Sequence, residues 1–208
     1  MWRTALSITV LAFALGTGAV AQPAVSVRAN AGAAFFQSPE GLNNVLNSGV
    51  DLGLGAGVEL YRGLELVLEG GYDRFTLNGD NLALLDETLS VETADIEGGA
   101  LNVFSGTLGL RYTVQATGDV RPYASGGVGL YHSVLERIDV PQREDPSSRL
   151  SATRQGYYAA LGSKFRVNST YSFFFEPRYV IVDTRGSELD TRTSTRYVTV
   201  RIGVDVRL

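Results

Sequence analysis

Residues 50–61 read VDLGLGAGVELY. Every even-numbered residue in this stretch is apolar. The odd-numbered residues are Asp51, Gly53, Gly55, Gly57, Glu59 and Tyr61. Successive side chains of a β-strand point to opposite faces, whereas a helix would mix the two sets around its circumference. The stretch therefore predicts a β-strand with one apolar face and one small or polar face.

The same alternation recurs along the chain. It predicts seven further strands, over 25–36, 64–75, 103–114, 122–134, 157–167, 172–182 and 196–208. Each is about the length of a tilted membrane-spanning strand, roughly 9–11 residues.

The connections between these strands alternate in length. Three are short, namely the Arg62-Gly63 turn, 115–121 and 168–171. Four are long, namely 38–49, 78–100, 135–156 and 183–195. This rhythm predicts an all-β fold, an eight-stranded antiparallel up-and-down transmembrane β-barrel. In such a barrel the short turns and both termini are periplasmic, and the long loops are extracellular.

Residues 1–21, MWRTALSITVLAFALGTGAVA, have the pattern of a secretory signal peptide. Arg3 provides a positive start, 5–15 are mostly apolar, and Ala19-Val20-Ala21 forms a small-x-small cleavage site. A transmembrane anchor is less favoured because the apolar stretch is short and contains Ser7 and Thr9. We expect cleavage after residue 21 and a mature barrel domain over 22–208.

The composition excludes several classes of site. The 208 residues contain 18 Lys and Arg against 22 Asp and Glu, a net charge of −4, which argues against a nucleic-acid partner. There is no Cys, so disulfides and cysteine-ligated zinc are excluded. His132 is the single histidine, so a multi-histidine metal site is excluded as well. We expect no cofactor and no metal ligands.

The alternation alone leaves open which face is inside, because a soluble lipocalin-like barrel would turn its apolar face inward. Glycines are frequent on the polar face, and small residues fit the crowded interior of an eight-stranded barrel. Aromatic residues stand near both ends of the apolar face, as in the two girdles of a membrane barrel. They are Tyr112, Phe165 and Phe173 at the turn end, and Phe35, Tyr72, Phe104, Tyr157 and Tyr179 at the loop end. The asymmetric loops and the alternation that continues to Leu208 point the same way, so we expect the apolar face to meet lipid.

Four stretches resemble the small eight-stranded outer-membrane barrels of the OmpA/OmpX-like class. They are GLELVLEGGYDRF (63–75), RPYASGGVGLY (121–131), FFFEPRYVIV (173–182) and YVTVRIGVDVRL (197–208). The resemblance implies a bacterial outer-membrane location, contact with membrane lipid and lipopolysaccharide, and a final strand read by the outer-membrane barrel assembly machinery. That class usually ends on Phe, whereas this chain ends on Leu208. The peptidoglycan-binding domain that follows the barrel in some members is not expected here.

With the apolar face outward, the inner face carries equal numbers of acids and bases. The acids are Asp51, Glu59, Glu65, Glu69, Asp73, Glu176 and Asp205, and the bases are Arg28, Arg111, Lys164, Arg166, Arg178, Arg201 and Arg207. Side chains just fill an eight-stranded interior, and an open channel normally takes about 16 strands. An unpaired buried charge costs several kcal/mol. The sequence therefore predicts a lumen plugged by ion pairs.

His132, Ser133 and nearby Glu136 suggest a hydrolase, because some small outer-membrane barrels that modify lipid A use His and Ser. Adjacent strand residues point to opposite faces, so His132 and Ser133 do not form a base–nucleophile pair on a regular strand. His132 is expected to face lipid near the outer rim. We therefore assign no catalytic residues.

Two of the long loops are charged. Loop 78–100 has no Lys or Arg, and its acids are Asp80, Asp86, Glu87, Glu92, Asp95 and Glu97. Clustered carboxylates suit hard cations, but the spacing is not that of an EF-hand. Bridging to lipopolysaccharide by divalent cations stays open beside a simply solvated loop. Loop 135–155 is mixed, with Glu136, Asp139, Glu144 and Asp145 against Arg137, Arg143, Arg149 and Arg154. Its arginines suit lipid phosphates, but an exposed polar loop is favoured.

These patterns favour a non-enzymatic outer-membrane barrel. Its role is structural, or it binds an extracellular ligand through its loops, since loops on a rigid scaffold commonly carry binding function. A narrow pore for small solutes and a lipid-modifying enzyme are the alternatives.

Overall fold

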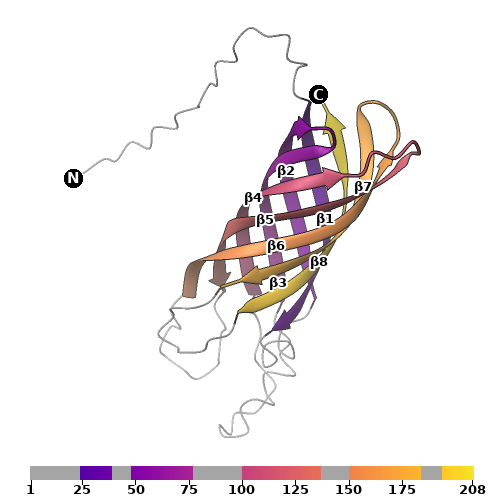
Figure 1. The fold of residues 1–208 in the computed structure, drawn as a ribbon. Coiled ribbons are helices and arrows are strands. Elements are labelled where there is room, and N and C mark those ends of the chain that lie inside the picture. Colours follow the sequence, from indigo (N-terminus) through magenta and orange to yellow (C-terminus); the bar gives the residue numbers. More distant parts are fainter. Residues whose placement is uncertain (1–23, 39–47, 77–99, 137–149, 184–193) are drawn as a thin grey trace, which may run out of the picture.

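The computed structural model describes residues 24–38, 48–76, 100–136, 150–183 and 194–208. Within them the chain forms eight strands that close into a barrel in sequence order (Figure 1). The strands are β1 (Val25–Ser38), β2 (Gly49–Tyr61), β3 (Leu64–Thr76), β4 (Ala100–Thr113), β5 (Val120–Leu135), β6 (Leu150–Arg166), β7 (Tyr171–Val182) and β8 (Thr195–Arg207). Every strand pairs antiparallel with its neighbours, and β1 pairs with β8. The predicted eight-stranded up-and-down barrel is confirmed. In the part of the chain that the structure describes, no helix is long and apolar enough to cross a membrane.

All the strands except β7 extend further at the loop end than the alternation predicts. The clearest correction is β6, which begins at Leu150 rather than at 157, so Arg154 belongs to a strand and not to a loop. Residues 150–156 pair with the end of β5. Their outward side chains Ser151, Thr153 and Gln155 are polar and exposed. Apolar and polar residues therefore do not alternate there, although the backbone ladder continues.

The short turns lie at the same end of the barrel as the first residues of β1 and the last of β8 (Figure 1). Ser26 pairs with Arg207 at this end. The tightest turn, Arg62-Gly63, needs glycine because Gly63 has a φ of 79°, in the left-handed region. We call this the turn end and the opposite one the loop end.

The apolar face of the barrel points outward, as predicted. Leu54 is 68 % exposed and Ile202 is 64 % exposed on the outer surface, whereas Arg111 and Glu176 are fully buried inside. The aromatic residues expected in the two girdles also lie outward, and Tyr72 and Phe104 pack together with ring centres 5.0 Å apart. An apolar outer wall and a charged interior are the inverse of a soluble barrel and are typical of a barrel whose outer wall is covered by lipid.

Candidate functional site

Three arginines and three carboxylates from five strands form a network in the middle of the lumen. They are Arg28 (β1), Asp51 (β2), Glu69 (β3), Glu176 and Arg178 (β7) and Arg201 (β8). None of these side chains is more than 4 % exposed. We call this group the central network.

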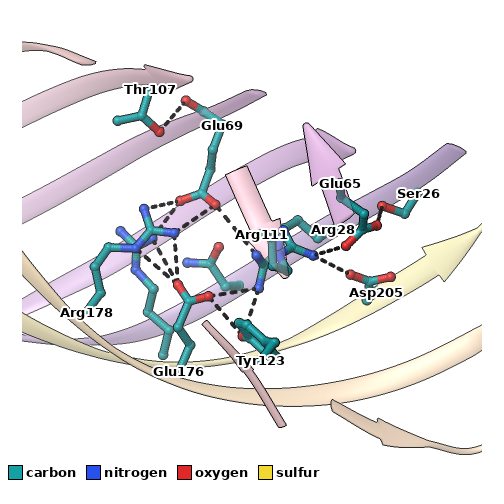
Figure 2. A network of polar contacts seen from close by, with 12 residues as sticks. Ser26, Arg28, Glu65, Glu69, Thr107, Arg111, Tyr123, Glu176, Arg178 and Asp205 are labelled. Atoms are coloured by element: carbon teal, nitrogen blue, oxygen red, sulfur yellow. Dashed lines mark hydrogen bonds and ion pairs between the residues drawn. The ribbon is translucent and has the colours of Figure 1, made fainter. Parts of the chain in front are cut away.

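Arg178 and Arg201 share the carboxylate of Glu69. The Nη1 atom of Arg178 lies 2.7 Å from Oε1 of Glu69, and its Nη2 donates to Oε2 at 3.1 Å, a bidentate contact. Arg201 places Nη1 2.6 Å from the same Oε1 and Nη2 2.6 Å from Oδ2 of Asp51. Figure 2 shows the Arg178 guanidinium between Glu69 and Glu176, whose Oε1 it contacts at 2.8 Å. The network thus joins opposite walls of the barrel.

Aromatic rings cover two of the arginines. Arg28 Cζ lies 3.9 Å from the ring centre of Phe174, and Arg178 Cζ lies 4.2 Å from that of Tyr158. A guanidinium is weakly hydrated and stacks well on an aromatic face. These contacts stabilise the arginines where water is excluded.

Glycines on the inner face provide the space for these large side chains. A methyl group at Gly162 would overlap the ring of Tyr123, whose hydroxyl donates to Oε2 of Glu176 at 2.9 Å. A methyl group at Gly55 would lie 3.2 Å from Cγ of Arg28, a tight contact. The glycine-rich inner face is therefore complementary in volume to the arginines and tyrosines opposite.

A second charged group lies nearer the turn end. Arg111 and Lys164 share Glu65 and Asp205. Arg111 Nη1 lies 3.2 Å from Oε2 of Glu65 and 3.3 Å from Oδ2 of Asp205, and Lys164 Nζ lies 3.1 Å from the same Asp205 oxygen. Ser26 also donates to Glu65, at 3.1 Å.

The turn end of the lumen holds a polar pocket of about 290 Å³. Two more exposed ion pairs stand there, Arg207 with Glu59 at 2.8 Å and Arg166 with Asp119 at 3.2 Å. Hydroxyl and amide groups of Gln115, Ser169 and Thr170 complete much of the wall. The lumen is thus polar and open to solvent at this end, and its charged side chains are tightly paired further in.

The predicted inner charges are confirmed, but the set omitted Arg121, which also lines the lumen at the turn end, and one acid departs from the expected pairing. Asp73 is 1 % exposed and faces Asp51 across β2 and β3. It accepts a hydrogen bond from Tyr197 at 2.9 Å, and its Oδ1 atom has no hydrogen-bond partner. Among the described residues, no cation forms an ion pair with it. The equal numbers of acids and bases did not predict the isolation of Asp73, because they do not say which charges lie close together.

An apolar layer closes the lumen at the loop end. Phe75 packs edge-on against Phe36 and Tyr197, with ring centres 5.6 Å apart in both pairs. The buried residues of this layer are Ala34, Phe36, Phe75, Val103, Tyr131, Tyr158, Val180, Val182 and Tyr197. This layer was not predicted from the sequence. Extending the alternation of each strand toward the long loops would have placed these residues on the inner face.

The candidate catalytic residues are not brought together. His132 lies on the outer face, where its Nδ1 atom is 2.8 Å from Oγ1 of Thr153, and the neighbouring Ser133 points inward. Glu136 belongs to a different group, since it accepts a hydrogen bond from Asn102 at 2.8 Å. A base, a nucleophile and a carboxylate on opposite faces do not form a catalytic triad.

Within the described residues, no group of three or more His, Asp and Glu side chains is arranged to hold a metal ion. The acids of loop 78–100 lie outside the described residues, as do residues 137–149 of the mixed loop. Of that loop's charges, Glu136 and Arg154 are described.

Comparison with protein families gives one match over nearly the whole chain. A family model described as "Outer membrane protein beta-barrel domain" matches residues 5–207. A comparison with curated proteins gives no match.

Solved structures of small outer-membrane barrels have the same fold. The chain is 17 % identical to Neisserial surface protein A, with a TM-score of 0.60 over 89 % of this chain and 99 % of that one. It is 16 % identical to the outer membrane protein OprG from Pseudomonas aeruginosa, with a TM-score of 0.54 over 89 % and 96 % of the two chains. A major outer membrane protein from Thermus thermophilus is 12 % identical, with a TM-score of 0.50 over 88 % and 99 %. At these identities the likeness establishes the fold alone.

Proposed function

The chain belongs to the outer membrane protein β-barrel family, and on this premise we propose that it is a non-enzymatic membrane scaffold. Its lumen is sealed, and its long loops carry a structural or surface-binding role on the extracellular side. Its termini are periplasmic, its outer wall contacts lipid and lipopolysaccharide, and its last strand is read by the barrel assembly machinery.

The central network is the observation that carries this proposal. Its three arginines are matched by three carboxylates at ion-pair distance, and all are buried. Separating such pairs leaves uncompensated charge in a medium of low dielectric constant, which is strongly unfavourable. The apolar layer then covers the network on the loop side. A lumen filled in this way supports a static scaffold whose variable surface is its loops.

A narrow pore for small solutes is the second candidate. The polar pocket at the turn end reaches inward to Glu65, Lys164 and Asp205, as the entrance of an ion path would. A complete path would also need the central network and the apolar layer to move aside. The scaffold is the better supported function because two consecutive barriers block the lumen.

A lipid-modifying enzyme is the third candidate. The pair of His132 and Thr153 faces outward near the loop end, where lipid headgroups lie. No carboxylate among the described residues is hydrogen-bonded to His132, and its neighbour Ser133 faces the lumen. A histidine with a single hydroxyl partner provides little for hydrolysis.

Two assays on the purified, folded protein separate these functions. Single-channel recording in planar bilayers should show no steady conductance, and incubation with radiolabelled lipid A should give no turnover. Steady conductance would replace the scaffold with the pore, and turnover abolished by His132→Ala would replace it with the enzyme. Cell fractionation with a heat-modifiability gel should first place the folded barrel in the outer membrane.

The proposed orientation has its own test. An epitope inserted within residues 137–149 should be labelled by antibody on intact cells. The same epitope at the Arg62-Gly63 turn should be labelled only after the outer membrane is permeabilised. The reverse pattern would invert the orientation.

A further inference from the structure

One cation in the turn-end pocket, Arg121, has no counter-charge among the described residues. Each of its neighbours has a carboxylate: Lys164 contacts Asp205, Arg166 contacts Asp119, and Arg207 contacts Glu59. Arg121 lines the same pocket, and no carboxylate among the described residues lies within ion-pair distance of it. Its Nε atom is buried and has no hydrogen-bond partner in the part of the chain that the structure describes.

The position of Arg121 in the sheet makes its lack of a carboxylate partner among the described residues unusual. Arg121 on β5 stands directly opposite Lys164 on β6. Like charges at directly opposed positions of an antiparallel pair destabilise a sheet. The carboxylates nearest to Lys164 are already shared with Arg111, so the turn end of the lumen carries an excess of positive charge.

The pocket wall also holds Glu59, Glu65 and Asp205, but each of these carboxylates is in an ion pair with a cation, and the other polar groups of the wall suit an anion. Gln115, Ser169 and Thr170 contribute amide and hydroxyl donors on the turns, and Ser172 contributes another at the start of β7. A guanidinium presents its donors in a planar fork that matches the oxygens of phosphate. A pocket of about 290 Å³ also has ample room for a phosphate group and its first water molecules.

We propose that the turn-end pocket is a binding site for a phosphate group, with Arg121 as its principal ligand and Lys164 as the second cation. The phosphate belongs either to a soluble ion or ester or to a lipid headgroup that reaches over the rim. This site lies at the opposite end of the barrel from the long loops and does not depend on what they bind.

The test begins with the full barrel in maltoside micelles, which contain no phosphate group. Inorganic phosphate is titrated in, and the Nε–H signals of the arginine side chains are followed by NMR. The signal of Arg121 should shift and saturate, and in the variants that lack Arg121 the Nε–H signals of Arg166 and Arg207, which line the same pocket, report binding. Arg121→Gln should weaken binding about tenfold or more, since a hydrogen bond to a charged group is lost. Arg121→Lys keeps the charge but not the planar fork of donors, so its affinity for phosphate should lie between that of the unchanged protein and that of Arg121→Gln.

Arg74→Gln is the matched control. Arg74 is a half-exposed arginine paired with Glu136 on the loop side, so this variant removes the same charge away from the pocket. It should bind phosphate as the unchanged protein does. A heat-modifiability gel checks that each variant is folded.

A second arm identifies the source of the phosphate. The protein is moved, in buffer without phosphate, to nanodiscs in which phosphatidylglycerol replaces a phosphate-free glycolipid in increasing mole fractions. A shift of the Arg121 signal there assigns a lipid headgroup, and a shift only with inorganic phosphate in micelles assigns a soluble ligand. The proposal is overturned if neither arm gives a saturable shift, or if Arg121→Gln and Arg74→Gln weaken binding equally.

Discussion

Arg178 on β7 and Glu69 on β3 meet across the lumen, although they are 109 residues apart in the sequence and their strands are not neighbours in the barrel. Nη1 of Arg178 lies 2.7 Å from Oε1 of Glu69, and Nη2 donates to Oε2 at 3.1 Å. Both side chains are 3 % exposed. This ion pair therefore links two strands on opposite sides of the barrel wall across the lumen. The first prediction tests this pair.

Arg178→Ala should destabilise the barrel by about 3–5 kcal/mol, because it leaves three buried carboxylates of the central network with two arginines, so one buried negative charge is uncompensated. Urea unfolding in lipid bilayers measures the change. Arg207→Ala is the comparison, since Arg207 is 55 % exposed at the lumen mouth and its pair with Glu59 should contribute only about 0–1 kcal/mol. Equal losses for the two variants would mean that the central network does not stabilise the fold.

The same Arg178→Ala variant should also change the electrical behaviour of the barrel. We expect the unchanged protein to be silent in single-channel recordings and the variant to show brief openings, because water can enter the vacated volume and Tyr158 of the apolar layer loses the guanidinium on which it packs. Large, steady conductance before mutation would contradict a sealed lumen.

Removing the charge of Asp51 should destabilise the barrel, whereas removing the charge of Asp73 should not. Asp51→Asn breaks the contacts with Arg201 and should cost several kcal/mol. Asp73 has no ion pair among the described residues, so Asp73→Asn should be neutral or stabilising, since an amide replaces a charge that burial disfavours. Urea unfolding of both variants checks this, and a large loss of stability from Asp73→Asn would contradict the expectation that the Asp73 charge is not needed for folding.

Charge on the outer wall should be costly in proportion to its depth in the bilayer. Leu54→Arg, in the middle of β2, should destabilise the barrel by about 2–4 kcal/mol, whereas Leu60→Arg at the turn end of the same strand should cost about 0–1 kcal/mol. Folding yields and urea unfolding in liposomes measure both. Two equal costs would mean that the membrane does not span the barrel where the apolar band lies.

Processing remains a prediction from sequence. The mature protein should begin at Gln22 and contain no tryptophan, because the single tryptophan, Trp2, lies within 1–21. Intact-mass measurement of the membrane-inserted form checks this. A mass that retains Trp2 would contradict cleavage.

The alternation of residues along each strand determined most of the fold. In VDLGLGAGVELY the face of each side chain follows from its parity, a local property of an extended backbone that needs no partner. The order of long and short connections then determined which strands are neighbours. Where local alternation stopped, as at Ser151, Thr153 and Gln155, the strand was missed, because pairing with β5 and not apolar burial holds that part of β6 in place.

The pairing of charges was decided only by the tertiary structure. Parity placed Arg178, Glu69 and Asp73 on the inner face, but it did not say at which height in the lumen each one lies. That height depends on the register of all eight strand pairs around the closed barrel, which brings Arg178 to Glu69 and leaves Asp73 against Tyr197. The register of β5 and β6 also sets Arg121 opposite Lys164, with no carboxylate of the described residues within ion-pair distance of Arg121. Composition and alternation determine which charges enter the lumen, whereas the ion pairs depend on distances between residues far apart in the chain, and only the closed barrel sets those distances.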